Sequence, residues 1–263
     1  MTSPSETPYF RGMIRLVLPK EHGSWSLALE PLTLGLLASP STAGAALAVA
    51  VLAGFFLRRP VKLLLGGSAD PRRPQALSAL ILLGTTAAAS LALAAVLSSL
   101  GQLWPLLPAV PAGAAFMWFD ARGESREAAA ELTGALALAM IPAAFATLAG
   151  WPPAPALALA AIMAGRSVPA VMTIRTYLRR QKGQAVSAGL ALAASAAAVA
   201  GAMLLARADL APRASTVVMA ALLIRTGVLL GPVRPQLPAS KVGVAESVLG
   251  GILVIVLALG WIR

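Results

Sequence analysis

Long apolar runs recur along the whole chain, and they constrain its fold more than any other feature of the sequence. A helix of about 17 to 25 mostly apolar residues is long enough to cross the hydrocarbon core of a bilayer. We therefore predict an all-α, polytopic integral membrane protein with about nine transmembrane helices. The predicted spans cover residues 24–39, 43–57, 76–99, 103–119, 131–149, 155–174, 186–206, 214–232 and 243–261.

The composition favours a single membrane domain. Of the 263 residues, 58% are hydrophobic and 12% are charged, whereas about a quarter of a soluble domain is charged. No hydrophilic region is long enough for a soluble domain, so residues 24–263 are predicted to form one transmembrane domain. Residues 1–23 are predicted to be a cytoplasmic or interfacial segment, without the continuous apolar stretch of a signal peptide. Within it, residues 9–19 fit a short interfacial helix with Arg11 and Arg15 toward the headgroups.

The basic residues predict the orientation. A formal net charge of +11 would suggest nucleic acid as the partner of a soluble protein, but the cytoplasmic loops of membrane proteins also collect Lys and Arg. Most of the 21 basic residues fall in the N-terminal segment and in the loops on the same side of the predicted spans, whereas Arg207, Arg213 and Arg263 fall on the other side. We therefore expect the N-terminus in the cytoplasm, the C-terminus outside, and a multi-pass protein of the cytoplasmic (inner) membrane. Membrane lipids are the expected partners, and nucleic acid is not.

Several kinds of site are excluded by residue type. The chain has no cysteine and one histidine, so it can form no disulfide, no thiolate site and no histidine cluster for a metal. We expect neither a metal nor a cofactor.

Four charged residues fall inside predicted spans, where an ionised group is costly unless it has a partner or a watery cavity. These are Glu30, Arg166, Arg225 and Glu246. They could form Glu–Arg bridges that tie helices together, or they could line a polar cavity that opens toward the cytoplasm. Arg225 and Glu246 lie in the predicted cytoplasmic half, as does His22.

The two largest predicted cytoplasmic loops carry basic residues at helical spacing. Arg59 and Lys62 share a face beside Arg58, and Arg175 and Arg179 share another, with Tyr177 between them. Arginine suits phosphate and carboxylate groups, although positive-inside bias and contact with anionic headgroups would produce the same pattern. The candidate anion- or ligand-binding residues are Lys20, Arg58, Arg59, Lys62, Arg166, Arg175, Tyr177 and Arg179.

The stretch from Lys20 to Glu30 contains the only histidine, at the entrance to the first span. Glu21, His22 and Glu30 are the candidates for acid–base catalysis, while the alternative for His22 is a capping or interfacial role. The mixed charges of residues 119–127 are expected to cap the following span and to solvate the loop rather than to bind a ligand.

Three motifs resemble the YwiC-like family of bacterial membrane proteins. The most specific is Leu18-Pro19-Lys20-Glu21-His22-Gly23-Ser24-Trp25, and weaker ones are Phe56-Leu57-Arg58-Arg59-Pro60 and Arg175-Thr176-Tyr177-Leu178-Arg179-Arg180. The resemblance covers essentially the whole chain but implies little about activity.

A more distant resemblance is to the UbiA superfamily of intramembrane prenyltransferases. Nine helices, the larger loops after the second and sixth spans, and the stretch from Gly134 through Pro142 to Trp151 are similar to that superfamily. The resemblance implies a helical bundle, and in the superfamily Asp-rich motifs in the two loops hold Mg²⁺ for a prenyl diphosphate. Here the first loop has Arg58, Arg59 and Lys62 with only Asp70 later, and the second has no acidic residue. Because two Mg²⁺ sites need carboxylates, metal-dependent prenyl transfer is not expected.

Three functions remain open. The first is a protein that binds an anionic lipid or isoprenoid-type ligand in a basic cavity on the cytoplasmic side. The second is a divergent UbiA-like prenyltransferase without the aspartates. The third is a small-anion transporter, suggested by Arg166 and Arg225, although no inverted repeat is visible. The sequence predicts no oligomeric state.

Overall fold

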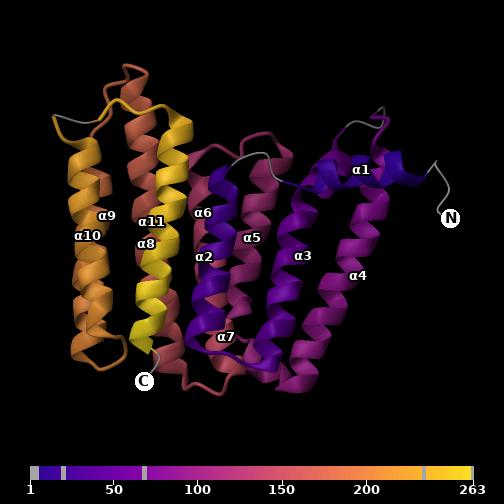
Figure 1. Cartoon of the computed structure of the whole chain (residues 1–263), viewed down its shortest axis with the longest axis horizontal. Coiled ribbons are helices and arrows are strands. Elements are labelled where there is room, and N and C mark those ends of the chain that lie inside the picture. The colour runs from indigo at the N-terminus through magenta and orange to yellow at the C-terminus, as the bar shows by residue number, and fades with distance from the viewer. Residues whose placement is uncertain (1–5, 19–21, 67–69, 233–234, 262–263) are drawn as a thin grey trace.

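The computed structural model describes residues 6–18, 22–66, 70–232 and 235–261, and these residues form helices joined by turns. An array of long helices stands side by side, and α1 lies crosswise at one end of α3 and α4 (Figure 1). The elements are α1 (Glu6–Val17), α2 (His22–Ala38), α3 (Thr42–Leu65), α4 (Arg73–Leu97), the short 3-10 helix η1 (Leu100–Leu103), α5 (Leu106–Ala121), α6 (Ala128–Ala139), α7 (Ile141–Leu148), α8 (Pro153–Gln181), α9 (Gly189–Arg207), α10 (Arg213–Leu230) and α11 (Ala239–Trp261).

The described helices have the lengths and compositions of a multi-pass membrane protein. Six helical stretches are long and apolar enough to cross a membrane: Arg73–Leu97, Ala128–Leu148, Pro153–Gln181, Gly189–Arg207, Arg213–Leu230 and Ala239–Trp261. Two shorter apolar helices cover Trp25–Ala38 and Leu106–Ala121. The all-helical membrane class is thus confirmed for these residues, while nine crossings and the orientation stay predictions.

Two predicted spans differ from the structure for local reasons. The predicted span 131–149 is divided into α6 and α7 at Met140, because Pro142 has no N–H to donate and its ring crowds the preceding turn. The predicted span 155–174 continues to Gln181 as α8, so Arg175, Tyr177 and Arg179 lie on the helix itself.

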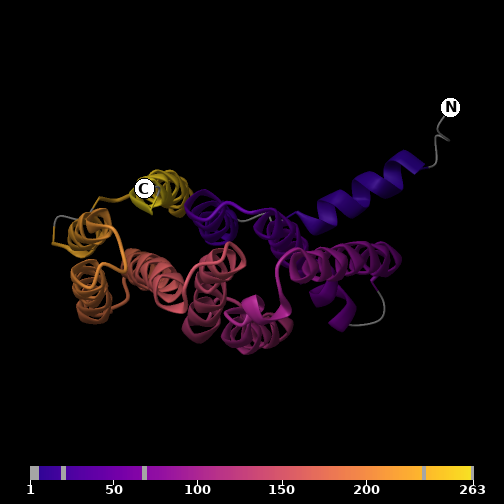
Figure 2. The same ribbon diagram turned by 90° about the horizontal axis from the view of Figure 1, so that it is seen from below.

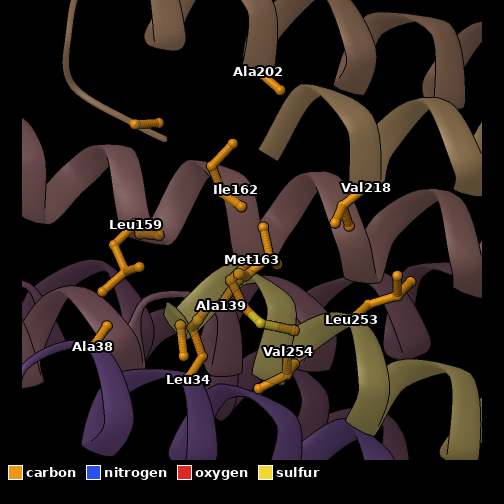
Figure 3. Packing of buried hydrophobic residues seen from close by; sticks show 14 of the residues in the cluster. Leu34, Ala38, Ala139, Leu159, Ile162, Met163, Ala202, Val218, Leu253 and Val254 are labelled. Atoms are coloured by element: carbon orange, nitrogen blue, oxygen red, sulfur yellow. The ribbon is translucent and has the colours of Figure 1, made fainter. Parts of the chain in front are cut away.

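The chain closes on itself through its last helix. Viewed along the helices, α11 lies beside α2, and α8 and α6 lie on the opposite side (Figure 2). Between these helices is an apolar cluster with contributions from α2, α6, α7, α8, α9, α10 and α11 (Figure 3). Its fully buried members include Leu34, Leu159, Met163, Val254 and Leu257.

A second core cluster is organised around Phe145 of α7, whose side chain is completely buried. The ring sits between two glycines on different helices. A Cβ added to Gly35 of α2 would lie 2.5 Å from Phe145 Cδ2, and one added to Gly44 of α3 would lie 3.0 Å from Cδ1. The absence of two side chains therefore lets α2, α3 and α7 pack around one aromatic ring.

Substitution of Gly35 tests this packing. We expect Gly35→Ala to lower the thermal unfolding temperature in a fixed detergent, by an amount equivalent to about 1–3 kcal/mol, because overpacking displaces the ring or a helix. Gly54→Ala in α3 is the matched control, since nothing lies within 4 Å of its added Cβ. Equal effects of the two substitutions would contradict the packing described for Phe145.

Candidate functional site

Glu30 and Arg166 form a buried ion pair between α2 and α8. Arg166 Nη2 lies 3.2 Å from Glu30 Oε1, and the side chains are 9% and 4% exposed for Glu30 and Arg166, respectively. The hydroxyl of Ser26, one turn before Glu30, donates to the same carboxylate oxygen. For these two residues the structure therefore shows the helix-bridging arrangement rather than an open pair of charges.

Gly250 of α11 makes room for this pair. A Cβ at Gly250 would lie 1.8 Å from Glu30 Oε1 and 2.7 Å from Arg166 Nη2. No side chain larger than hydrogen fits there unless the pair or α11 moves. Gly250 was not among the predicted site residues, although its position carries one signal: it lies four residues after Glu246, on the same face of an apolar helix.

Arg225 of α10 pairs with Glu246 of α11. Arg225 Nε donates to Glu246 Oε1 at 2.9 Å, and a second guanidinium nitrogen contacts the other carboxylate oxygen. Both Glu246 and Arg225 are close enough to Glu30 to act on it electrostatically. The four charges therefore belong to one network at the junction of α2, α8, α10 and α11.

This network has no net charge, because two arginines face two glutamates. A buried pair with good geometry fixes how helices meet, and removal of one member leaves an uncompensated charge. The pairing also removes the specific reason for assigning small-anion transport, since neither Arg166 nor Arg225 offers an unmatched positive charge.

Three buried hydroxyls bridge the neighbouring helices. Thr226 Oγ1 of α10 lies 3.2 Å from Thr173 Oγ1 of α8 and 3.2 Å from Ser195 Oγ of α9. Each hydroxyl is also within hydrogen-bond distance of a carbonyl oxygen of its own helix, and because each has one proton, it donates either to that carbonyl or to a neighbouring hydroxyl. Small polar side chains of this kind hold membrane helices together. The cluster could not be predicted from the sequence, because its three residues lie far apart in it.

Arg58 and Lys62 of α3 converge on Asp120 of α5. Arg58 Nε lies 2.9 Å from Asp120 Oδ2, Arg58 Nη2 lies 3.2 Å from Oδ1, and Lys62 Nζ lies 2.8 Å from Oδ1. Arg58 also stacks over Phe116, 4.8 Å from the ring centroid. Only 1% of the Asp120 side chain is exposed. The prediction that Asp120 solvates a loop is therefore wrong: α5 continues to Ala121, and its last turn buries this carboxylate against two cations.

Arg59 does not join this cluster, although it neighbours Arg58. Its guanidinium donates to the carbonyl oxygens of Arg15, at 3.3 Å, and Leu18. Arg59 and Lys62 thus share a helical face but serve different partners, and Arg59 contacts the C-terminal end of α1.

The second predicted basic group is divided among three separate contacts. Arg175 bonds to Glu131 at 3.2 Å, lies 3.7 Å from Glu127, and also donates to the carbonyl of Arg126. Tyr177 is completely buried, and its hydroxyl donates to the carbonyl of Pro235 at 2.6 Å. Exposed Arg179 donates to Gln184 Oε1 at 2.7 Å. These contacts do not bring the three side chains around a common centre.

Part of the predicted catalytic set is not described. Lys20 and Glu21 lie outside the described residues, and so does the side chain of His22, whose backbone begins α2. Glu30 is placed, but Ser26 and Arg166 already occupy one oxygen of its carboxylate.

Cations pair with most of the described acidic residues, namely Glu30, Asp70, Asp120, Glu127, Glu131 and Glu246. Within the ranges that the structure covers, no three His, Asp or Glu side chains come together as ligands for a metal ion. Asp70 accepts hydrogen bonds from the Arg72 side chain at 2.7 and 3.0 Å and from its backbone N–H at 2.8 Å. These bonds lower the pKa of Asp70 to about 2. Asp70, which lies between α3 and α4, is thus paired with Arg72.

A shallow hollow of about 400 Å³ lies elsewhere, at the turn between α8 and α9. It is lined by Arg180, Gly183, Gln184, Ala185 and Val186. None of the predicted ligand-binding residues lines it.

Gly250 provides a sharp test of the buried pair. We expect Gly250→Ala to destabilise the protein by about 3 kcal/mol or more, because its methyl group takes the space of a charged pair that is costly to break. The neighbouring Gly251→Ala is the control, since nothing lies within 4 Å of its added Cβ. The two variants are compared by their unfolding temperatures in the same detergent. An equal decrease for Gly251→Ala and Gly250→Ala would contradict the close packing of Gly250 against the Glu30–Arg166 pair.

A double-mutant cycle tests the pair itself. Glu30→Met and Arg166→Met should each cost about 3–5 kcal/mol, because each leaves a buried charge without its partner. The double substitution should cost clearly less than the sum of the two single losses. Additive losses would mean that the two side chains are not energetically coupled.

Part of the chain matches a known protein family. A family model described as YwiC-like protein matches residues 18–144, a segment that includes Glu30, Arg58, Lys62 and Asp120. No curated protein and no solved structure matches the chain. The first two sequence motifs lie in the matched segment, and the third lies beyond it. Residues 18–144 of the chain are therefore similar to the YwiC-like family.

Proposed function

We propose that the chain is a bundle of nine membrane-crossing helices in the bacterial cytoplasmic membrane, with its N-terminus inside. The distribution of charge supports this orientation. The end of the bundle that carries α1 also carries Arg58, Arg59, Lys62, Arg72 and Arg73. The described basic residues at the opposite end are Arg207 and Arg213, where α9 leads into α10. Cytoplasmic loops of membrane proteins collect Lys and Arg in this way.

Aromatic residues support the depth of the bundle in the bilayer. Trp118, near the end of α5, is exposed, and Arg122 stacks on it at 4.2 Å. Trp104 and Trp151 lie beside the connections at the other end of the bundle, before α5 and before α8. Tryptophan at both ends of helices is typical of the two membrane–water interfaces.

At the cytoplasmic end, we propose, the protein binds the head of an anionic lipid or isoprenoid-type ligand at the cluster of Arg58, Lys62 and Asp120. The observation that carries this proposal is the imbalance of charge: two cations converge on one buried carboxylate. The Arg58 side chain is 25% exposed and that of Lys62 is 43% exposed, so both can still reach another anion. Their unused N–H groups suit phosphate oxygens.

The neighbourhood of the cluster adds positive charge. Arg59 follows Arg58 in α3, and it contacts the backbone carbonyl of Arg15 in α1. At the depth of lipid headgroups, each basic residue near an anionic membrane surface contributes about 1 kcal/mol. A phosphate held here would lie at the end of α3 and α5, from where an acyl or prenyl tail can run along the apolar helices.

The divergent-prenyltransferase alternative has less support. It needs a metal-independent way to handle a diphosphate, and its proposed acid–base group Glu30 is bonded to Ser26 and Arg166. The lipid-binding proposal needs only the excess charge that Arg58 and Lys62 provide.

Lipid content after purification tests the proposal. In a triple variant with Arg58→Gln, Lys62→Gln and Asp120→Asn, we expect anionic lipid or isoprenoid phosphate copurifying with the protein to fall several-fold by mass spectrometry. The third substitution avoids leaving Asp120 buried without a partner. The matched control is Arg207→Gln with Arg213→Gln, two exposed arginines at the other end.

The single variant Asp120→Asn tests whether the Asp120 carboxylate competes with the ligand for Arg58 and Lys62 or helps these residues to bind it. If a ligand anion shares the two cations with Asp120, neutralising this carboxylate should leave bound lipid unchanged or increase it. Unchanged lipid in the triple variant, or an equal loss in the control, would refute the site.

A further inference from the structure

The helix α1 is attached to the bundle along one face. Its Met13 and Leu16 side chains are 9% and 6% exposed, and α1 packs against α3 and α4. At Gly12 the approach is close, because an added Cβ would lie 3.1 Å from Gln75 Nε2 of α4. The described half of α1 is thus seated on the bundle by one row of residues.

Arg59 fixes the end of the same helix. It donates to the carbonyl oxygens of Arg15 and Leu18, which lie in and just after the last turn of α1. The last carbonyl groups of a helix lack partners within it and carry partial negative charge, so a guanidinium there is favourable. Arg59 therefore acts as a clamp for α1.

The opposite face of α1, with the residue that follows it, is exposed and carries apolar and basic side chains. Ile14 is 49% exposed and Leu18 is 42% exposed, and exposed Arg15 lies between them in the sequence. Because α1 lies crosswise to the long helices (Figures 1 and 2), this face runs along the membrane plane when the bundle spans the bilayer. A helix with apolar and basic residues in this position is typical of the headgroup layer.

We propose that the outer face of α1 binds the anionic headgroup layer of the membrane, with Ile14 and Leu18 in the acyl boundary and Arg15 at the phosphates. The bilayer is the occupant that matches the charge and position of this face. A second copy of the chain is disfavoured by area: a stable interface buries about 800 Å² per partner, which two side chains cannot supply. Burial of Ile14 and Leu18 in lipid removes their apolar surface from water.

Spin labelling can locate this face, because the chain contains no cysteine. The protein is labelled with a nitroxide at Ile14→Cys in nanodiscs that contain phosphatidylglycerol. The control is Glu124→Cys, an exposed position in the turn between α5 and α6. At position 14 we expect several-fold higher accessibility to lipid-soluble oxygen than to a water-soluble nickel complex, and the reverse at position 124.

Lipid charge provides the second measurement. Immersion of the label at position 14 should be deeper in phosphatidylglycerol than in phosphatidylcholine, and Arg15→Gln should remove this difference. Preferential access of the nickel complex to position 14 in both lipids would overturn the proposal, as would shielding from both reagents, which indicates protein contact. Both labels and Arg15→Gln alter exposed side chains. Each variant is therefore expected to elute from size-exclusion chromatography as a single peak at the position of the unlabelled protein.

Discussion

The buried contact between Glu30 and Arg166 is the interaction on which the closure of the bundle depends. It joins α2, near the start of the chain, to α8, and α11 can approach only because Gly250 has no side chain. Two charges in an apolar setting are tolerated because each is the partner of the other and because Ser26 adds a donor. The arrangement specifies the register of three helices that apolar packing alone would allow to slide.

The charged residues of this chain divide into two kinds by their stoichiometry. In the interior, Glu30 with Arg166 and Glu246 with Arg225 are matched one to one, which suits a role in helix assembly. At the end of α3, two cations share Asp120, and the surplus charge is accessible. The ratio of cations to carboxylates in each cluster therefore distinguishes residues that hold the helices together from residues that can bind a ligand. Residue type and position in the membrane alone do not distinguish them.

The lengths of the apolar runs were sufficient to predict the helical membrane class and the position of most helices. Long apolar runs between prolines and basic turns leave few alternatives when every backbone polar group must be bonded within its own segment. The break at Met140 was missed because a single proline can either kink or divide a helix, and the outcome depends on what packs around it. The extension of α8 to Gln181 was missed because its last turns are polar and lie beyond the apolar run.

The site was harder to predict than the fold because contacts between distant residues have no local signature. The four intramembrane charges were recognisable from their cost in lipid, but their pairing depends on which helices are neighbours. Asp120 was placed with loop residues because it precedes a charged turn, and only its contact with α3 identifies it as the centre of a cluster. Gly250 has no chemistry of its own, so its role appears only when the atoms that fill its vacant side-chain position are known.

Buried polar groups are unevenly distributed along the bundle, and this asymmetry affects which end a ligand can approach. The Glu246–Arg225 pair, the hydroxyls of Thr173 and Thr226 and the Tyr177 hydroxyl lie in the halves of α8, α10 and α11 nearest the end with α1. Toward the other end, the same helices meet through the apolar cluster of Figure 3. A polar solute that crosses a membrane through a protein needs polar partners along its whole path, because a polar group without a hydrogen-bond partner in an apolar region costs several kcal/mol. In the half of the described bundle away from α1, the buried polar side chains are hydroxyls such as Ser39, Thr147 and Ser215, and no buried ion pair is present. This difference favours access for a ligand from the end that carries the basic cluster over conduction of a solute through the centre.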